Sequence, residues 1–175
     1  MTYRCLRWAI FTLALIAFLG TTPWAAHRVS GTLTRTYVIV TDTDLVGDVI
    51  CDVGSSPCFS FGASGVELRL NGFTIAGRAD PVTGCGGAAF PNEFGITTNG
   101  QHSVGVRGPG VVQRFRNHGV LVIGGSRNAR IEGLTASTNC TAGIRVMATA
   151  FDTLVEGNTV VRNGATTPGS SCGGI

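Results

Sequence analysis

A nine-residue stretch occurs twice in this chain, and this repetition is the feature that most restricts the fold. Residues 131–139 read IEGLTASTN, and residues 155–163, 24 positions later, read VEGNTVVRN. A second landmark has the same period: Gly95, Gly119 and Gly143 are 24 positions apart, and each is followed by Ile or Val. Two landmarks with one period indicate stacked structural repeats, in which each repeat covers the apolar face of its neighbour.

Short alternating segments within each period predict strands. Residues 129–132, 104–107 and 68–71 alternate between apolar and polar side chains, which is typical of a strand with one buried face. No window of 11 or more residues after position 26 has the spacing of an amphipathic helix. Three short strands and three turns in 24 residues make one coil of a parallel β-helix, whose coils stack about 4.8 Å apart. The sequence therefore predicts an all-β solenoid.

The repeat also predicts which residues lie on top of one another. We expect Ile131 to stack with Val155 in the core and Asn139 to stack with Asn163 at a turn. Two interpretations of the asparagines remain open. They can form a hydrogen-bonded ladder of inward side chains, or they can simply tolerate the backbone dihedrals of a turn.

The first 26 residues are predicted to be a secretory signal peptide. Arg4 and Arg7 precede an apolar run of 11 residues, 9–19, which is short for a membrane span. Retention as an N-terminal anchor is the alternative, because Trp24 fits poorly before a cleavage site after Ala26. The expected location is secreted, periplasmic or at the cell surface, with no stable membrane span after cleavage.

The charge of the mature chain, residues 27–175, argues against a nucleic-acid partner. The 13 basic residues are all arginine, and removal of Arg4 and Arg7 leaves 11 against 10 acids, a net charge of +1. A near-neutral chain has no long-range attraction for a polyanion. Glycine is abundant, at 26 of 175 residues, which predicts many turns.

The cysteines predict disulfides in an exported chain. Cys51 and Cys58 enclose six residues and are expected to form a disulfide that closes a turn. Cys140 and Cys172 fall at nearly the same register of adjacent coils, so we expect them to pair, with Cys85 left over or in competition. The spacing does not fit a zinc site.

These features resemble a known group. The segments GVELRLNGFTIAG (65–77), GVRGPGVVQRFRNHGVLV (105–122) and IEGLTASTNCTAGIRV (131–146) resemble the right-handed parallel β-helix proteins of the pectin-lyase-like superfamily, over residues 36–175. The resemblance implies a right-handed parallel β-helix and says little about activity. The group includes polysaccharide lyases and hydrolases, surface proteins, and a periplasmic copper-handling accessory family.

The strongest pair of candidate catalytic residues is Glu132 and Glu156. Asn71, Arg107, Glu132 and Glu156 are predicted to form one outward column, which places the two glutamates on adjacent coils. Carboxylates about 5 Å apart serve retaining glycosidases. The alternative is a solvated ladder in which Arg107 pairs weakly with Glu132.

The resemblance implies a second place to look for a lyase site. A lyase of this superfamily carries calcium-binding acids and a basic residue on the outer face of one sheet; here the corresponding column is Thr97, Leu121 and Arg145, without an acid. Calcium is therefore expected only if the chain is a lyase, and no other cofactor is expected. Four further arginines can bind an anionic glycan or be solvated turn residues: Arg114, Arg116, Arg127 and Arg130.

The predicted organisation is a signal peptide (1–26) followed by one β-helix domain (27–175). Residues 31–51 are expected to supply entry strands that cap the stack, and coils are expected over 58–175. Ile175 falls one residue into a new strand, so we expect the chain to be truncated and its last coil to self-associate.

The expected function is an exported β-helix protein that binds cell-surface or extracellular polysaccharide without catalysis. The alternative is a polysaccharide lyase or glycoside hydrolase whose catalytic coils are missing here. Copper delivery is a remote third alternative, because a copper site needs clustered histidine or methionine ligands and the three histidines and two methionines are scattered along the chain. One of them, His118, is interpreted as a polar turn residue.

Overall fold

The computed structural model describes residues 25–79, 85 and 92–164, and within them it contains strands and turns but no helix. Most strands have three residues, as the alternating segments predict. The strands are β1 (His27–Leu33), β2 (Tyr37–Ile39), β3 (Thr43–Cys51), β4 (Phe59–Phe61), β5 (Glu67–Arg69), β6 (Thr74–Ala76), β7 (Ile96–Thr97), β8 (Gly105–Arg107), β9 (Val111–Gln113), β10 (Val120–Val122), β11 (Arg130–Glu132), β12 (Thr135–Ser137), β13 (Ile144–Val146), β14 (Leu154–Glu156) and β15 (Thr159–Val161).

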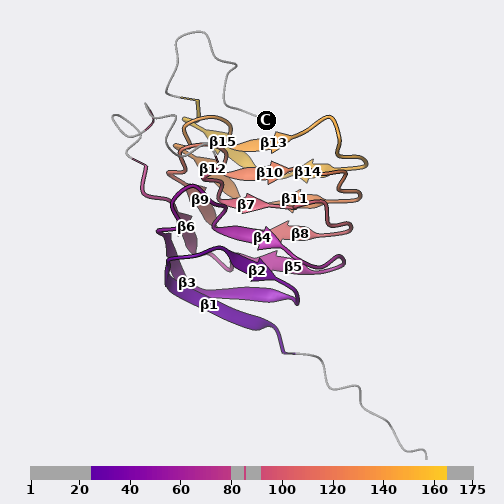
Figure 1. The fold of residues 1–175 in the computed structure, drawn as a ribbon, viewed down its shortest axis with the longest axis horizontal. Helices are drawn as coiled ribbons and strands as arrows, with labels where there is room; N and C mark the ends of the chain where they lie inside the picture. The colour runs from indigo at the N-terminus through magenta and orange to yellow at the C-terminus, as the bar shows by residue number, and fades with distance from the viewer. Residues whose placement is uncertain (1–24, 80–84, 86–91, 165–175) are drawn as a thin grey trace, which may run out of the picture.

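The strands pair in parallel throughout and form a solenoid-like stack (Figure 1). One sheet has the order β13-β10-β7-β4-β2. The other has the order β14-β11-β8-β5-β3-β6-β9-β12-β15, with β1 paired to β3. We call the strands of one period a coil: β2 and β3 form coil 1, β4–β6 coil 2, β7–β9 coil 3, β10–β12 coil 4 and β13–β15 coil 5. The predicted all-β, all-parallel architecture is confirmed.

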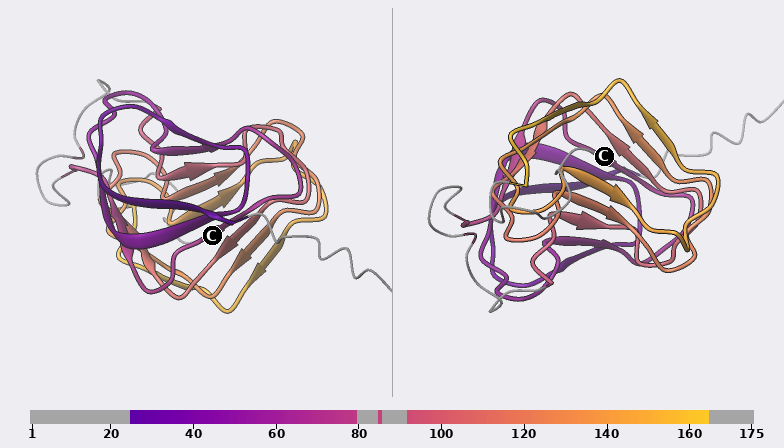
Figure 2. Two further views of the ribbon diagram at one scale, coloured as in Figure 1. Left: turned by 90° about the horizontal axis from the view of Figure 1, so that it is seen from below. Right: turned by 90° about the horizontal axis from the view of Figure 1, so that it is seen from above.

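The long strand β3 explains why one sheet contains two columns of strands. Its first part, at Thr43, pairs with Leu68 of β5, and its later part, at Val49, pairs with Ile75 of β6. In the next coil these two parts have become separate strands. Seen end-on, the coils superpose around one interior (Figure 2).

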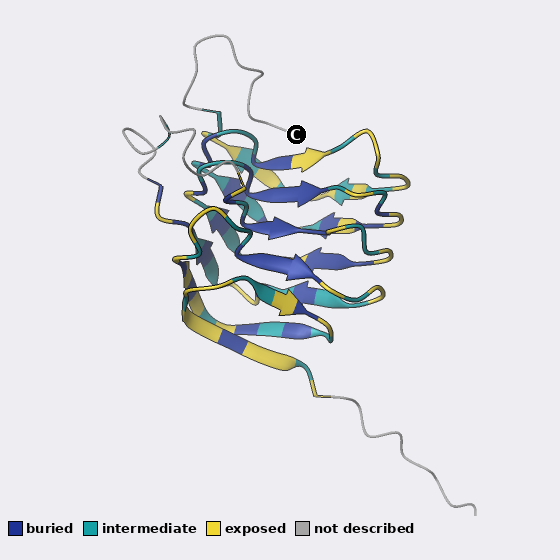
Figure 3. Ribbon diagram, viewed as in Figure 1, coloured by how far each residue is buried: buried dark blue, intermediate teal, exposed yellow. Residues whose placement is uncertain are grey.

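The register confirms the predicted 24-residue period in coils 3 to 5. Val120 of β10 pairs with Ile96 on one side and Ile144 on the other. Ile131 pairs with Val155, as the sequence repeat predicts. The apolar residues of these rows make the core, in which burial is highest in the middle coils and lower at β1 and β13 (Figure 3). The largest fully buried side chains are Phe59, Phe61, Phe115, Ile39, Leu45, Leu68, Leu70, Ile75, Ile96, Ile131, Leu134 and Ile144.

Close packing at one corner explains the glycine landmark. A Cβ on Gly95 would lie 2.4 Å from the Gly119 carbonyl oxygen, and a Cβ on Gly119 would lie 2.7 Å from the Asn139 side-chain nitrogen. At Gly143 it would lie 2.5 Å from a Val160 methyl group. Stacked coils leave no space for a side chain here, so glycine recurs with the period of the coil.

The asparagines form a ladder, which decides between the two interpretations. Asn139 is fully buried, and its side-chain nitrogen donates to Asn163 Oδ1 at 3.0 Å and to the Val112 carbonyl at 3.2 Å. Its Oδ1 accepts the Phe115 N–H at 3.1 Å. The positive φ of this turn belongs instead to the preceding residues, with 52° at Thr138 and 55° at Arg162. The asparagines therefore serve the stack with their side chains.

The disulfides confirm one predicted pair and replace the other. Cys51 and Cys58 are bonded, with a Cα separation of 5.7 Å. Cys140 is bonded to Cys85, with a Cα separation of 5.3 Å, so the expected Cys140–Cys172 pair is wrong. Cys85 comes between β6 and β7 in the sequence, and its bond to Cys140 places it at the corner after β12. Cys172 lies outside the described residues.

Two other predictions concern the ends of the chain. Residues 1–24, most of the expected signal peptide, and 165–175, where truncation is expected, lie outside the described residues. In the part that the structure describes, no helix has the length and apolar character needed to cross a membrane.

Candidate functional site

The candidate site is a groove on the outer face of the β3-β6 part of the larger sheet. Thr32 pairs with Ile50, and Ile50 pairs with Ala76, so their side chains form one row across three strands. This row lines a cavity of about 640 Å³. Ile50 is 51% exposed, which gives the floor an apolar surface open to solvent.

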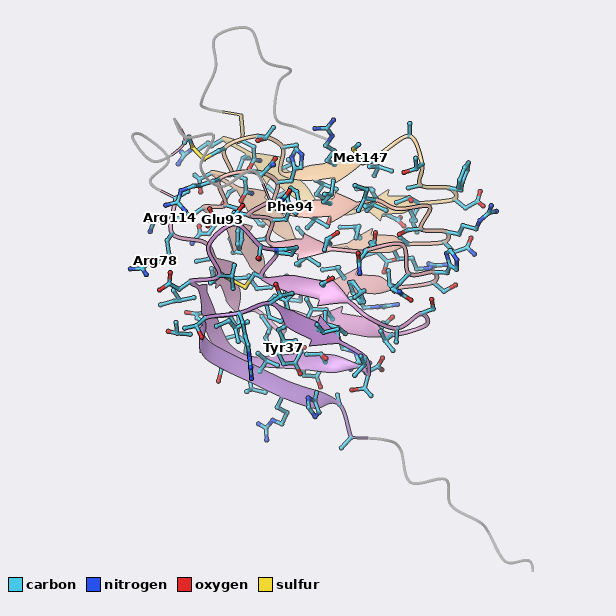
Figure 4. The ribbon with its side chains drawn as sticks, viewed as in Figure 1. Tyr37, Arg78, Glu93, Phe94, Arg114 and Met147 are labelled. Carbon is cyan, nitrogen blue, oxygen red and sulfur yellow. A yellow bond between two sulfur atoms is a disulfide. The ribbon has the colours of Figure 1, made fainter. Side chains whose placement is uncertain are left out.

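Two arginines border this groove. Arg78 and Arg114 both line it, and in Figure 4 their side chains lie at the same side of the stack. Arg78 forms an ion pair with Asp52 at 2.5 Å, and both side chains are about half exposed, at 59% and 48%. An exposed ion pair of this kind contributes little to stability, so a ligand anion can displace Asp52 at small cost.

Arg114 is held in place but has no carboxylate partner among the ion pairs of the described residues. Its Nε donates to the Ala79 carbonyl oxygen at 3.0 Å. Its backbone has a φ of 62°, a conformation that non-glycine residues adopt at a cost of about 1–3 kcal/mol. Anchoring at Nε leaves the two terminal guanidinium nitrogens for a planar anion.

A second, smaller cavity of about 360 Å³ adjoins the groove. Asp52 and Arg78 line both cavities, so their ion pair forms the boundary. The second cavity is also lined by Glu93 and Arg116. Glu93 is only 2% exposed, and its Oε2 accepts a hydrogen bond from Arg116 Nη1 at 2.8 Å.

Glu93 is a candidate that the sequence reasoning missed. Burial raises the pKa of its carboxyl group, and the hydrogen bond and charge of Arg116 oppose this without reversing it. A buried carboxyl group with a raised pKa beside a cavity is typical of a functional site, although structural ion pairs have the same signature. The sequence carried one signal for Glu93, because Glu93, Asn117 and Thr141 are 24 positions apart and an acid therefore occupies the position that is neutral in later coils. The structure confirms this register: the Asn117 N–H donates to the Glu93 carbonyl oxygen, and the Thr141 N–H donates to the Asn117 carbonyl oxygen.

His118 lies in a turn between β9 and β10, as predicted, but it is not a solvated turn residue, because it is only 4% exposed. The ring stacks on Phe94, with centroids 5.8 Å apart and planes 5° apart. Desolvation by burial, followed by the charge of Arg145, lowers the pKa of His118 to about 4. The sequence did not reveal this because the turn residues of a stacked coil are covered by the coils above and below.

The structure places the predicted glutamates on adjacent strands of the other part of the larger sheet, and Glu132 belongs to an ionic row there. Glu132 and Glu156 are register neighbours, as predicted. Glu132 lies 3.8 Å from Arg107 and 3.4 Å from Arg130, so it belongs to a chain of ion pairs. Neither glutamate lines either of the two cavities.

The predicted membership of this column is wrong at one place. The structure pairs Arg107 with Arg69, not with Asn71. Asn71 has a φ of 51° and donates from its side chain to the Leu45 carbonyl, so it belongs to the turn after β5. Each residue of the predicted column is followed by a glycine, namely Gly72, Gly108, Gly133 or Gly157, and this glycine was a poor guide to the register of coil 2.

The predicted lyase column is correct in register but is not an open face. Leu121 pairs with Thr97 and with Arg145. Thr97 and Leu121 are only 5% and 3% exposed. Arg145 Nη1 lies 3.2 Å from His118 Nε2. The column therefore presents one arginine, in contact with a buried histidine.

The four clustered arginines are divided between two sides of the stack. Arg114 and Arg116 line the cavities described above. Arg127 lies over the ring of Phe151, 5.0 Å from its centroid, and Arg130 joins the ionic row. The structure thus places Arg114 at the groove and Arg116 at the adjoining cavity, whereas Arg127 and Arg130 line neither.

Within the described residues, no group of three or more His, Cys, Asp or Glu side chains is arranged to hold a metal ion. Comparisons with protein-family models, with curated proteins and with solved structures find no match.

Proposed function

We propose that this chain is an exported right-handed parallel β-helix protein, of the pectin-lyase-like type, that binds an acidic extracellular polysaccharide without cleaving it. The observation that carries the proposal is the groove bordered by Arg78 and Arg114. The all-parallel stack with its 24-residue register supports the fold assignment. The two disulfides support an oxidising compartment outside the cytoplasm.

The groove has features that suit a sugar polymer. Its floor is an apolar row in which Ile50 can contact the C–H faces of sugar rings, and Thr32 adds a hydroxyl group. The row crosses three neighbouring strands, so the floor of the groove follows the direction of the stack. The terminal nitrogens of Arg114 supply a paired donor for a sugar carboxylate.

The test compares binding of a polyuronate and of neutral dextran to the full chain. Arg114→Ala is expected to weaken polyuronate binding by about 10- to 100-fold, the range for loss of a hydrogen bond to a charged group. Dextran binding should not change. Arg130→Ala is the matched control, because Arg130 is exposed on the other side of the stack. Equal polyuronate affinities for the wild type and Arg114→Ala would refute the proposal.

A second candidate is polysaccharide cleavage, favoured by one observation. Glu93 is a buried carboxyl group with a raised pKa beside the groove, as a general acid requires. The hydrogen-bonded ion pair of Glu93 with Arg116 argues for a structural role instead. Release of unsaturated or reducing sugar ends from a polyuronate, abolished by Glu93→Gln with binding retained, would establish the enzymatic function.

A further inference from the structure

His118 lies at a corner where three coils meet. Below it, the Gly95 N–H donates to the His118 carbonyl oxygen at 3.0 Å. Above it, the Gly119 N–H donates to the Ala142 carbonyl oxygen, also at 3.0 Å. The corner between β12 and β13 therefore rests directly on the turn that contains His118.

The imidazole ring faces two hydrogen-bond donors. The Ala142 N–H donates to Nδ1 at 3.2 Å, and Arg145 Nη1 lies 3.2 Å from Nε2. The ring is 4% exposed, and Phe94 covers one of its faces. Figure 4 labels Phe94 on the coil below.

Proton counting at the ring gives opposite results for its two charge states. A neutral imidazole has one acceptor nitrogen and can accept from Ala142 or from Arg145. A protonated imidazole has two N–H groups and accepts from neither. Its ring hydrogens would then face an N–H and a guanidinium, which have no lone pair to offer, and two positive charges would lie side by side.

We propose that His118 is an acid-sensitive switch. The neutral ring accepts a hydrogen bond at the corner between β12 and β13 and holds this corner closed, and protonation of the ring breaks its contacts with Ala142 and Arg145. Acidification then exposes the ring of Phe94 and frees the guanidinium of Arg145. The device is independent of the groove and of the proposed ligand.

The charged groups around the ring support this role for His118. Arg145 of β13 is the charge that faces the imidazole. On the coil below, Glu93 precedes Phe94, but its carboxylate is directed to Arg116. On the coil above, Cys140 is held in a disulfide and does not titrate.

The direction of the effect follows from linkage. The pKa of His118 is lowered to about 4, below the value of about 6.5 expected when the ring is free. The closed corner is therefore fully favoured above pH 6.5 and is progressively lost as the pH falls toward 4. Between these limits, the ratio of open to closed corner should rise on the order of 100-fold.

The experiment measures amide hydrogen exchange by NMR in the full, disulfide-bonded chain, corrected for intrinsic exchange. The protection of the Ala142 and Gly119 amides should fall on the order of 100-fold between pH 7 and pH 4. His118→Asn keeps an acceptor near the Nδ1 position but cannot be protonated, so in this variant the protection of the Ala142 and Gly119 amides should not change with pH. A fall of the same size in His118→Asn would overturn the proposal.

Two variants and one direct measurement complete the test. His102→Asn removes an exposed histidine whose Nδ1 also accepts a backbone N–H, from Arg127, and should leave the pH response intact. Glu93→Gln should leave it intact as well. In the wild type, the ring nitrogens of His118 should titrate with the same midpoint as the Ala142 exchange; a titration without any change in exchange would also overturn the proposal.

Discussion

Two rows of polar side chains run along this stack, and they differ in burial. The amide row joins Asn139 to Asn163 inside the corner after β12 and β15, and Asn139 is fully buried. The ionic row lies on the outer face of β3, β5, β8 and β11 and includes Asp42, which directly precedes β3; its side chains are 24% to 48% exposed, apart from Arg130 at 60%. Its members are Asp42, Asp44, Glu67, Arg69, Arg107, Arg130 and Glu132.

This difference in burial shows that a polar side chain does not stabilise the stack merely because it recurs in successive coils. A buried amide without a partner costs its full desolvation energy, about 1–3 kcal/mol for each group. An exposed ion pair exchanges its partner for water at almost no cost. The neutral, hydrogen-bonded row should therefore stabilise the stack more than the charged row, although the charged row has more members.

The largest expected effect comes from the disulfide beside the amide row. Replacement of Cys85 and Cys140 by serine should lower the free energy of unfolding by about 4 kcal/mol, because the bond closes a span of 55 residues. Replacement of Cys51 and Cys58, separated by 7, should cost only about 2.5 kcal/mol. Urea denaturation of both variants measures the difference; equal losses would contradict the loop-length explanation.

Asn139→Ala should follow, with a loss of about 3 kcal/mol in the free energy of unfolding. The substitution removes the acceptor of the Phe115 N–H and the donor to the Val112 carbonyl, both inside the stack. Chemical denaturation gives the value. A loss below about 1 kcal/mol would mean that water enters this corner, and the comparison with the ionic row would fail.

Asn163→Ala should cost less, about 1 kcal/mol. Asn163 accepts from the Asn139 backbone and side chain, but it is only partly buried, so water can replace it. The same denaturation assay applies. Equal losses for Asn163→Ala and Asn139→Ala would show that position within the row, and not burial, determines the contribution.

The smallest effects are expected in the ionic row. Arg107→Gln and Glu132→Gln should each change the free energy of unfolding by less than about 1 kcal/mol, and 1 M NaCl should reduce the change further. Glu156→Gln, which has no ion pair among the described residues, is the matched control. A loss above about 2 kcal/mol in the free energy of unfolding that persists in salt would show that the ionic row stabilises the stack as much as the amide row does.

Much of the fold could be predicted because the information is local and repeated. The pairing of Val120 with Ile96 and Ile144 follows from a fixed period, since a slip of one residue would turn every apolar side chain outward. The disulfide between Cys51 and Cys58 follows from a short span. The rejected Cys140–Cys172 pair rested on the same period, whereas the true partner, Cys85, is 55 residues from Cys140, which is not a multiple of 24.

The candidate site could be predicted only in part. The sequence pointed to Glu132 and Glu156, whose adjacency is real, but it could not show that Arg107 and Arg130 neutralise Glu132. Glu93 shares the register of Asn117 and Thr141, but the sequence could not show that its carboxyl group is buried beside a cavity.

By itself, the sequence determined that the chain forms short parallel strands, and it determined the register of coils 3 to 5, because the apolar pattern and the glycines recur there with one period. The register of coil 2 came from the structure, which pairs Arg107 with Arg69. Only the tertiary structure decided which polar residues are buried. Arg114 borders the groove, while Arg127, 13 positions later, lies over Phe151. His118 is covered by the coils on either side. Burial depends on what the neighbouring coils and the irregular segments place over a residue, and that is a property of three-dimensional packing that no local pattern encodes.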